Sequence, residues 1–167
     1  MVTLSGRYST PVPKSPTELI RLALEVAASV HSPQDLPIAA IITDSSGSVV
    51  ASSKNAVVQT DQPTAHAEML VIAGLGMKTL KRDAAHMTMS VTLEPCPMCA
   101  WAIRSAGIGR LIFGAYNQQY GAAGSVYDLL RDSRHGRRIE VLGGVLEHEC
   151  KQLLGDAFSD IRDNGVR

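Results

Sequence analysis

Residues 87–100 read Met-Thr-Met-Ser-Val-Thr-Leu-Glu-Pro-Cys-Pro-Met-Cys-Ala, a strand pattern followed at once by a helix start. In the first seven residues, apolar side chains alternate with Thr and Ser, which is the period of a β-strand. Pro97 suits the first turn of a helix, so we expect a helix from Cys96 to about Ala106. Cys96 and Cys99 then lie three residues apart on one helix face, where both sulfurs can bind a single ion.

A second motif, Pro-Thr-Ala-His-Ala-Glu at residues 63–68, also stands where a proline-marked loop turns into a helix. We expect this helix to run from about Ala65 to Met77. Within a helix, residues two apart point in nearly opposite directions. His66 and Glu68 can therefore serve one site only if the helix directs its N-terminal end toward that site.

His66, Cys96 and Cys99 together offer three ligands of the kinds that zinc prefers, and the fourth tetrahedral position is open to water. Zinc lowers the pKa of such a water from ~16 toward ~7, which supplies hydroxide at neutral pH. Glu68, beside the ion and not bound to it, can then carry the water's proton to a substrate. The pattern predicts hydrolytic attack on an electron-poor carbon.

Two other interpretations of the cysteines stay open. Cys150 would complete a closed structural zinc site, because structural sites take four protein ligands. Against this, Cys150 falls on the apolar face of the last predicted helix, where a small thiol packs in a core. A redox pair of Cys96 and Cys99 would leave His66 and Glu68 without a role.

Other conspicuous side chains are expected outside the set of metal ligands. Glu94 and Pro95 precede the first cysteine and are assigned to the surroundings of the ion, where Glu94 either orients the backbone or caps the helix. Trp101 is expected in the core or in a pocket wall. The other histidines are expected in solvent: His31, His86, His135 and His148.

The rest of the chain alternates predicted helices and strands. Ser15-Pro16-Thr17-Glu18 combines a hydroxyl N-cap, a proline at the first helical position and a glutamate three residues on, which predicts a helix start. Residues 36–43 and 49–55 predict a hairpin at the edge of a sheet. Further elements are expected as a loop at 56–63, a strand at 111–115, a brief helix near 126–131, a strand at 140–142 and a final helix. This order places helices on both faces of one mixed sheet.

Composition limits the class of protein. The chain has 167 residues with 16 Lys plus Arg and 16 Asp plus Glu, enough for one domain and without a net charge that attracts nucleic acid or a membrane. The longest apolar run, residues 36–42, is too short to cross a bilayer, and the N-terminus lacks the plan of a signal peptide. We therefore expect a cytoplasmic protein with no membrane partner, in which residues 1–14 form a flexible arm and residues 15–167 a single domain.

Five segments together resemble those of bacterial tRNA adenosine deaminases, within the cytidine/deoxycytidylate deaminase superfamily. They are Pro-Thr-Ala-His-Ala-Glu at 63–68, Val-Thr-Leu-Glu-Pro-Cys at 91–96, Pro-Met-Cys-Ala at 97–100, Ile-Gly-Arg-Leu-Ile-Phe-Gly-Ala at 108–115 and Gly-Ala-Ala-Gly-Ser at 121–125. His-x-Glu followed by Pro-Cys-x-x-Cys is the signature of zinc nucleobase deaminases. The resemblance spans roughly residues 18–162.

The resemblance implies a cytidine-deaminase-like fold, a three-layer α/β/α arrangement with a five-stranded mixed sheet. It implies a homodimeric enzyme with one Zn²⁺ per subunit that converts adenosine to inosine at the wobble position of a tRNA anticodon loop. Glu68 would be the catalytic residue, protonating N1 of adenine and the departing amino group. The resemblance also implies that Asn55 hydrogen-bonds the target nucleoside. Ala67, Tyr116, Asn117 and Tyr120 are further candidates for substrate contacts.

The chain departs from this family where RNA would be held. After Ala115 the family tends to carry an Arg-Asp pair and a Lys, whereas residues 116–120 here read Tyr-Asn-Gln-Gln-Tyr. The family's basic C-terminal tail is replaced by residues 160–167, which offer little attraction for phosphate. The two tyrosines can stack on splayed bases, which compensates in part. Four arginines are candidates either for phosphate contacts or for a solvated loop, namely Arg131, Arg134, Arg137 and Arg138.

Two other functions remain as alternatives. The reduced charge on the expected RNA surface also suits a deaminase of free nucleobases or nucleosides. A closed four-ligand metal site would instead make the chain a zinc-stabilised binding module without catalytic activity.

Overall fold

The computed structural model describes residues 14–29 and 34–163, without the side chains of residue 156 and residues 158–163. Residues 1–13 of the arm expected at 1–14, the helix-ending signal at 31–33 and the last residues of the tail lie outside this part. Along the chain the elements are α1 (Pro16–Ala28), β1 (Ala39–Thr43), β2 (Val49–Lys54), α2 (Val57–Thr60), α3 (Ala67–Asp83), η1 (Ala84–His86), β3 (Thr88–Leu93), α4 (Pro97–Ala106), β4 (Arg110–Ala115), η2 (Ser133–His135), β5 (Glu140–Leu142) and α5 (Glu147–Asp163).

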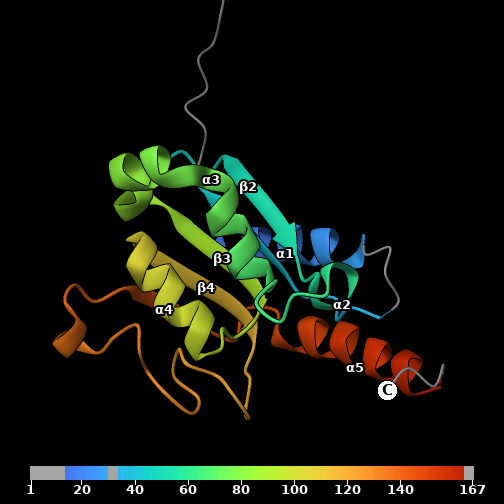
Figure 1. Ribbon diagram of the computed structural model, residues 1–167. Coiled ribbons are helices and arrows are strands. Elements are labelled where there is room, and N and C mark those ends of the chain that lie inside the picture. Colours follow the sequence, from blue (N-terminus) through green and yellow to red (C-terminus); the bar gives the residue numbers. More distant parts are fainter. Residues whose placement is uncertain (1–13, 30–33, 164–167) are drawn as a thin grey trace, which may run out of the picture.

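The sheet has five strands in the order β2-β1-β3-β4-β5, with helices on both faces (Figure 1). β1 runs antiparallel to β2 and β3, while β3, β4 and β5 are parallel to one another. The predicted three-layer α/β/α arrangement with a mixed sheet is therefore confirmed. The hairpin of β1 and β2 at one edge of the sheet is confirmed as well.

Alternation along the strands divides the core into two layers. In β4, Leu111 and Phe113 pack with Ile103 of α4, on the face that α3 also covers. Ile112, between them, packs on the other face with Ile20 of α1. Because successive side chains of a strand point to opposite faces, a single apolar run serves both layers.

Local signals of the sequence account for several element ends. The hydroxyl of Ser15 accepts a hydrogen bond from the backbone N–H of Glu18, whose carboxylate accepts in return from the backbone N–H of Ser15, so the predicted capping box is present. In the turn between β1 and β2, the carboxylate of Asp44 accepts from the backbone N–H groups of Ser46 and Ser48. Both devices satisfy backbone donors that a helix start or a turn leaves open.

The prediction of a helix near residues 126–131 is wrong. The backbone N–H groups of Val126 and Tyr127 both donate to the carbonyl of Gly121, which closes tight turns in place of a helix. An isolated bridge between Ala123 and Asp128 follows, where a helix would need continuous i to i+4 bonding.

Three further expectations need correction. The loop expected at 56–63 contains the short helix α2, and the helix expected to end at Met77 continues to Asp83 across a break at Gly76, where φ is +71°. Trp101 is not in the core: its side chain is 48% exposed and meets the ring of His135 edge-on at 5.1 Å.

Among the described residues, no helix combines the length and apolar character needed to cross a bilayer.

Gly114 of β4 tests how tightly the core layer that contains Ile20 and Cys150 is packed. A Cβ at this position would overlap the sulfur of Cys150 and come within 2.7 Å of the carbonyl oxygen of Thr92. We expect Gly114→Ala to lower the free energy of unfolding by about 1–3 kcal/mol, measured by urea denaturation, because the backbone of β3 cannot yield cheaply. Gly74→Ala is the control, since a Cβ there meets nothing within 4 Å. Equal stability of the two variants would contradict this packing.

Candidate metal centre and its cavity

The two motifs meet at the starts of two helices that cover the same face of the sheet. His66 is the N-cap of α3, and Cys96 is the N-cap of α4, both with extended backbone. Cys99 follows in the first turn of α4. The Nδ1 atom of His66 lies 3.8 Å from the sulfur of Cys96 and 3.5 Å from that of Cys99. The structure therefore brings the three predicted ligands together.

The spacing of these three atoms fits zinc. All three ligand atoms lie within 4.8 Å of one another. Around a tetrahedral zinc with bonds of about 2.0–2.3 Å, ligand atoms are about 3.5–3.8 Å apart, and the two distances to Nδ1 fall in that range. One imidazole and two sulfurs are also among the donors that zinc prefers. His66, Cys96 and Cys99 can therefore hold a zinc ion without rearrangement.

The protonation of the two thiols is coupled. A hydrogen bond from Cys99 lowers the pKa of Cys96 to about 4, while the same interaction raises the pKa of Cys99 well above its usual value. The hydrogen bond with Cys96 also raises the pKa of His66. Thus the pair loses one proton readily and keeps the second. A bound divalent cation favours the thiolate form of both cysteines.

Glu68 reaches the cavity because it lies in the first turn of α3. The helix begins at Ala67, so His66 precedes it and Glu68 lies in its first turn. The opposite directions of side chains two apart inside a helix therefore do not apply here, and both side chains line the same cavity. The condition set by the sequence, that this helix directs its N-terminal end at the site, is met. Glu68 is only 4% exposed, and burial raises the pKa of its carboxyl group. A buried carboxyl of this kind accepts and releases a proton near neutral pH more readily than an exposed one.

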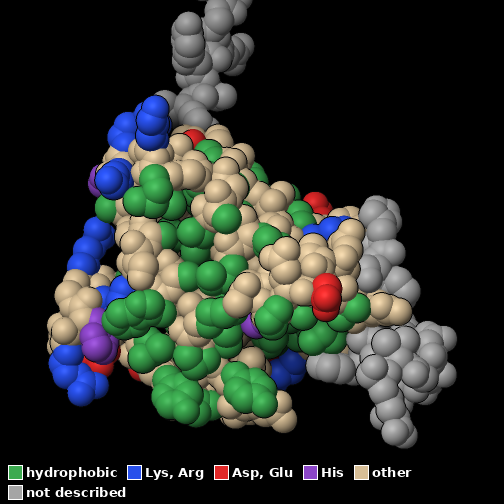
Figure 2. Space-filling model, in the orientation of Figure 1, with side chains coloured by type: hydrophobic (Ala, Val, Ile, Leu, Met, Phe, Trp, Pro, Cys, Tyr) green, Lys and Arg blue, Asp and Glu red, His purple; other side chains and the backbone are tan. Residues whose placement is uncertain are grey.

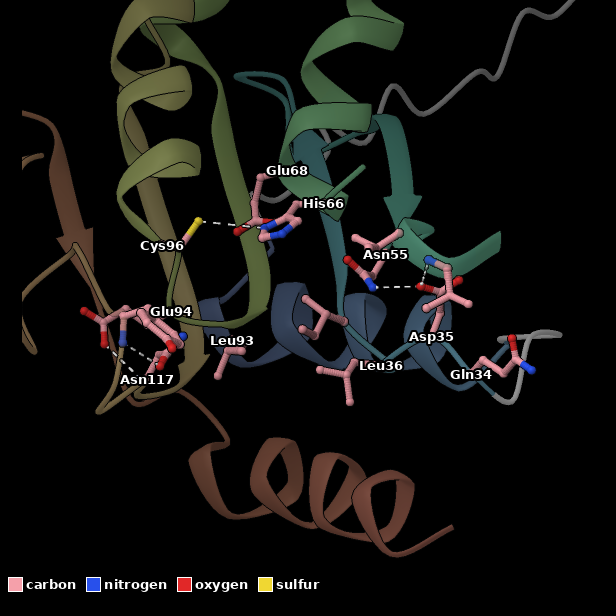
Figure 3. A pocket seen from close by; sticks show the side chains of 14 residues that line it. Gln34, Asp35, Leu36, Asn55, His66, Glu68, Leu93, Glu94, Cys96 and Asn117 are labelled. Atoms are coloured by element: carbon pink, nitrogen blue, oxygen red, sulfur yellow. Dashed lines mark hydrogen bonds between the residues drawn. The ribbon is translucent and has the colours of Figure 1, made fainter. Parts of the chain in front are cut away.

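A cavity of about 320 Å³ adjoins the ligands (Figure 3). Asn55, Asn117 and Tyr120 line it, as expected of substrate contacts, whereas Ala67 and Tyr116 do not. Ala67 is completely buried in the core. Tyr116 packs edge-on against Phe113 and lines a neighbouring cavity of about 510 Å³. The two cavities share Leu36, Leu93, Asn117 and Tyr120 as walls.

Glu94 organises the loop that forms one wall of the cavity. Its carboxylate is buried and accepts hydrogen bonds from the backbone N–H groups of Asn117, Ala123 and Ser125, at 2.9–3.0 Å, and from the hydroxyl of Ser125. The carbonyl of Pro95 accepts from the loop as well. Of the two roles considered for Glu94, orienting the backbone is therefore the one observed, although the backbone it orients is 23–31 residues downstream.

Sequence reasoning missed Asp35, which lines the cavity opposite the metal ligands (Figure 3). Its carboxylate is 4% exposed and accepts hydrogen bonds from Asn55, Val58 and Gln59. No short motif marks it, because these partners lie 20–24 residues downstream. The apolar walls at Leu36 and Leu93 were also missed, since both look like ordinary strand residues.

The four candidate arginines differ in what they bind. Arg131 pairs with Asp128 at 2.9 Å, and Arg134 with Asp132 at 2.6 Å. Arg137 and Arg138 are exposed, and among the described residues neither side chain has an ion-pair partner. The loop that carries them is tied to α4 by the guanidinium of Arg104, which donates to the carbonyls of Leu129, Leu130, Asp132, His135 and Arg137.

Basic side chains do not surround the mouth of the cavity. No Lys or Arg is among the described residues that line it, although Lys151 borders the neighbouring cavity. Figure 2 shows the middle of this face covered mainly by hydrophobic and neutral side chains, with most of the visible Lys and Arg along the left edge and smaller groups at the right and near the bottom. Among the described residues, no Lys or Arg therefore faces a ligand inside this cavity.

Cys150 does not belong to the metal centre. It is buried in the opposite layer with Ile20 and Leu154, and burial raises the pKa of its thiol to about 11. Within the described part of the chain, the group able to hold a metal comprises His66, Cys96 and Cys99 alone. The closed four-ligand site, and with it the non-catalytic binding module, therefore finds no support.

Comparisons with known proteins agree with a zinc-binding site at these residues. Residues 13–115 match the family described as the cytidine and deoxycytidylate deaminase zinc-binding region. The tRNA-specific adenosine deaminase of Haemophilus influenzae is 34% identical over 146 residues, 87% of this chain and 84% of the relative. That of Bacillus subtilis is 35% identical over 142 residues, 84% of this chain and 86% of the relative. The tRNA(Ile)-lysidine synthase of Deinococcus radiodurans is 35% identical over 95% of this chain, which spans only 27% of that longer protein.

Solved structures share the fold. One, from a study of A-to-I editing by tRNA:A34 deaminases at the wobble position of transfer RNA, has a TM-score of 0.73 and 34% identity, covering 83% of this chain and 99% of its own. The guanine deaminase of Nitrosomonas europaea has a TM-score of 0.72 at 22% identity, covering 90% of each chain. The second likeness concerns the fold alone.

We expect Glu94→Gln to lower the free energy of unfolding by about 1–3 kcal/mol, because glutamine places an NH₂ group against buried N–H donors. Hydrogen exchange should also quicken at the amides of Asn117, Ala123 and Ser125, whose acceptor is weakened. The control is Glu140→Gln, which removes an ion pair with Arg110 on the surface and should change stability by less than about 0.5 kcal/mol. Unchanged exchange at the three amides would contradict the role of Glu94.

Proposed function

Because the chain belongs to the cytidine and deoxycytidylate deaminases and, within them, to the family of tRNA-specific adenosine deaminases, we propose that it converts adenosine to inosine at the wobble position of a tRNA anticodon. The observation that carries this function is a cavity that joins a zinc-type ligand set to a buried carboxyl group. The reaction consumes one water: a C–O bond forms at C6 of adenine, the bond from C6 to the amino nitrogen breaks, and ammonia leaves.

We propose one zinc ion per subunit, held by His66, Cys96 and Cys99. When bound there, zinc supplies a Lewis acid that lowers the pKa of a water molecule toward neutrality. Two sulfur ligands match the formal charge of the ion, so that it can be held in a half-buried site without further carboxylates. Glu68 then stays free for proton transfer.

Glu68 is proposed to carry protons during the reaction. Its carboxyl group lies in the cavity beside the ligands, and its raised pKa, caused by burial, suits a group that takes a proton and gives it up again. We assign to Glu68 the proton of the attacking water, its delivery to N1 of adenine, and later protonation of the departing amino group. These transfers keep charge from accumulating on the base.

The target base must leave the stack of the anticodon loop to reach the cavity. We propose that Asn55, Asn117 and Tyr120 contact the flipped nucleoside, because all three line the cavity. Tyr116, on the neighbouring cavity, is assigned to stacking with a flanking base. Ala67 can contribute only through its backbone, since its side chain is completely buried.

Arg137 and Arg138 are our candidates for phosphate contacts, because both are exposed and without a carboxylate partner among the described residues. Arg131 and Arg134 would have to exchange Asp128 and Asp132 for a phosphate. This arrangement suits a protein without net charge, since such a protein needs a local contact to retain RNA.

We further propose that residues 15–167 act as a single domain after the arm at 1–14, that the chain forms a homodimer, and that it works in the cytoplasm with tRNA.

A second candidate function, deamination of free nucleobases or nucleosides, is favoured by one observation: no Lys or Arg lines the cavity in the described structure. A polyanionic substrate needs such contacts, and a free base does not.

Incubation with an anticodon stem-loop, and separately with free nucleobases and nucleosides, tests the function. We expect inosine in the stem-loop, detected by sequencing because inosine is copied as guanosine. Glu68→Ala should lower kcat by a factor of at least about 10²–10⁴, with unfolding temperature and zinc content retained, since only proton transfer is lost. Ammonia released from free bases or nucleosides alone would reject the tRNA function in favour of the second candidate.

Metal analysis of two cysteine variants tests the ligand set. We expect Cys99→Ser to reduce zinc from one per chain toward none, because a hydroxyl is a far poorer zinc ligand than a thiolate. Cys150→Ser should retain zinc, since Cys150 lies in the other layer of the core. Loss of zinc from the Cys150 variant, in a protein that still folds, would restore the closed four-ligand site.

A further inference from the structure

Asp35 is a buried acid that the proposed chemistry does not use. It lies on the cavity wall across from His66 and Glu68, and it is 4% exposed (Figure 3). No ion pair compensates its carboxylate among the described residues; three N–H donors do so instead. These are the side-chain amide of Asn55 at 3.1 Å and the backbone N–H groups of Val58 and Gln59, both at 2.9 Å. All three hydrogen bonds to this buried carboxylate come from residues 55–59. Asp35 therefore fixes the position of that segment.

The contact with Asn55 decides which end of the carboxamide faces the cavity. The carboxylate oxygens of Asp35 act as acceptors in all three contacts, so the NH₂ group of Asn55 faces Asp35. Figure 3 shows the amide nitrogen of Asn55 bonded to Asp35 and the oxygen directed to the side of His66 and Glu68. Without Asp35, rotation by 180° would exchange a donor for an acceptor at little cost.

The two backbone contacts fix the wall next to Asn55. Helix α2 begins after Ala56, whose side chain cannot cap it, and the carboxylate of Asp35 takes the place of a cap by accepting from Val58 and Gln59. Val57 and Val58 line the cavity from this helix. One side chain therefore positions both the polar and the apolar part of this wall.

We infer that Asp35 is a positioning residue for the substrate, acting through the carboxamide of Asn55. This inference rests on the proposed function, in which Asn55 contacts the flipped nucleoside. Asp35 lies on the opposite wall from Glu68, so its loss should weaken substrate binding and leave the proton-transfer step nearly intact. Loss of Asp35 should therefore raise KM and leave kcat nearly unchanged.

A double-mutant cycle tests this coupling on the stem-loop substrate, with Asp35→Asn, Asn55→Ala and the combined variant. Asp35→Asn is nearly isosteric, but its NH₂ group invites the carboxamide of Asn55 to turn over. We expect KM to rise by about tenfold or more in each single variant, as for a mispaired group in a recognition site, with kcat within about threefold. In the Asn55→Ala background, Asp35→Asn should raise KM by less than about twofold, because the residue through which it acts is gone.

Asp44→Asn is the matched control. Asp44 also accepts from two backbone N–H groups, but in the β1–β2 turn, at the other end of β1 from Asp35. This variant should lower stability and leave KM unchanged. Additive effects of Asp35→Asn and Asn55→Ala, or a rise in KM for Asp44→Asn equal to that of Asp35→Asn, would overturn the inference in favour of a general loss of stability.

The side-chain NH₂ signals of Asn55 in ¹⁵N–¹H NMR spectra of the zinc-loaded protein give a readout that needs no substrate. We expect both proton shifts to change in Asp35→Asn and to stay in place in Asp44→Asn. Unchanged signals in Asp35→Asn would overturn the inference even if the protein edits tRNA. If the wild-type protein deaminates only free bases, the proposed function fails while the NMR result still decides the role of Asp35.

Discussion

The site depends on two helices that begin at the same place above one sheet. His66 and Cys96 are the N-caps of α3 and α4, so their extended backbones bring the side chains to the helix ends, where they meet within 3.8 Å. β3 carries the chain directly to Cys96, and the packing of α3 and α4 on a shared apolar layer holds the two starts together. If either helix began one residue later, its ligand would no longer occupy the N-cap position.

Two buried carboxylates hold the irregular parts of the cavity. Glu94 gathers the backbone of residues 117–125, and Asp35 gathers Asn55 and the first turn of α2. In both cases an acid that shortly precedes or follows a strand accepts N–H groups from a segment 20 or more residues away. Loops whose backbone donors are satisfied in this way do not need regular secondary structure to be rigid. The cavity thus has firm walls although much of it is built from loops.

The central architecture and the grouping of the three candidate metal ligands follow from the sequence because their signals are local. The capping box at Ser15, the alternation in β3 and the spacing of Cys96 and Cys99 each act over a few residues, and each was confirmed in position. What could not be predicted depends on distant partners. The turns near residues 121–127 are held by the distant carboxylate of Glu94, which accepts from Ala123 and Ser125, and Asp35 gains its importance only when Asn55 folds beside it. Trp101 was misplaced because an apolar side chain on a helix does not reveal which face the sheet covers.

Helix α4 is a rigid spacer between the candidate metal centre and the loop of residues 129–138, which carries the four candidate arginines. Cys96 stands at one end, and Arg104, eight residues on, ties down the carbonyls of residues 129–137 near the other. At 1.5 Å per residue, the two anchor points are about 12 Å apart along the helix axis. If Arg137 and Arg138 contact phosphate as proposed, the helix sets the distance between that contact and the three candidate metal ligands.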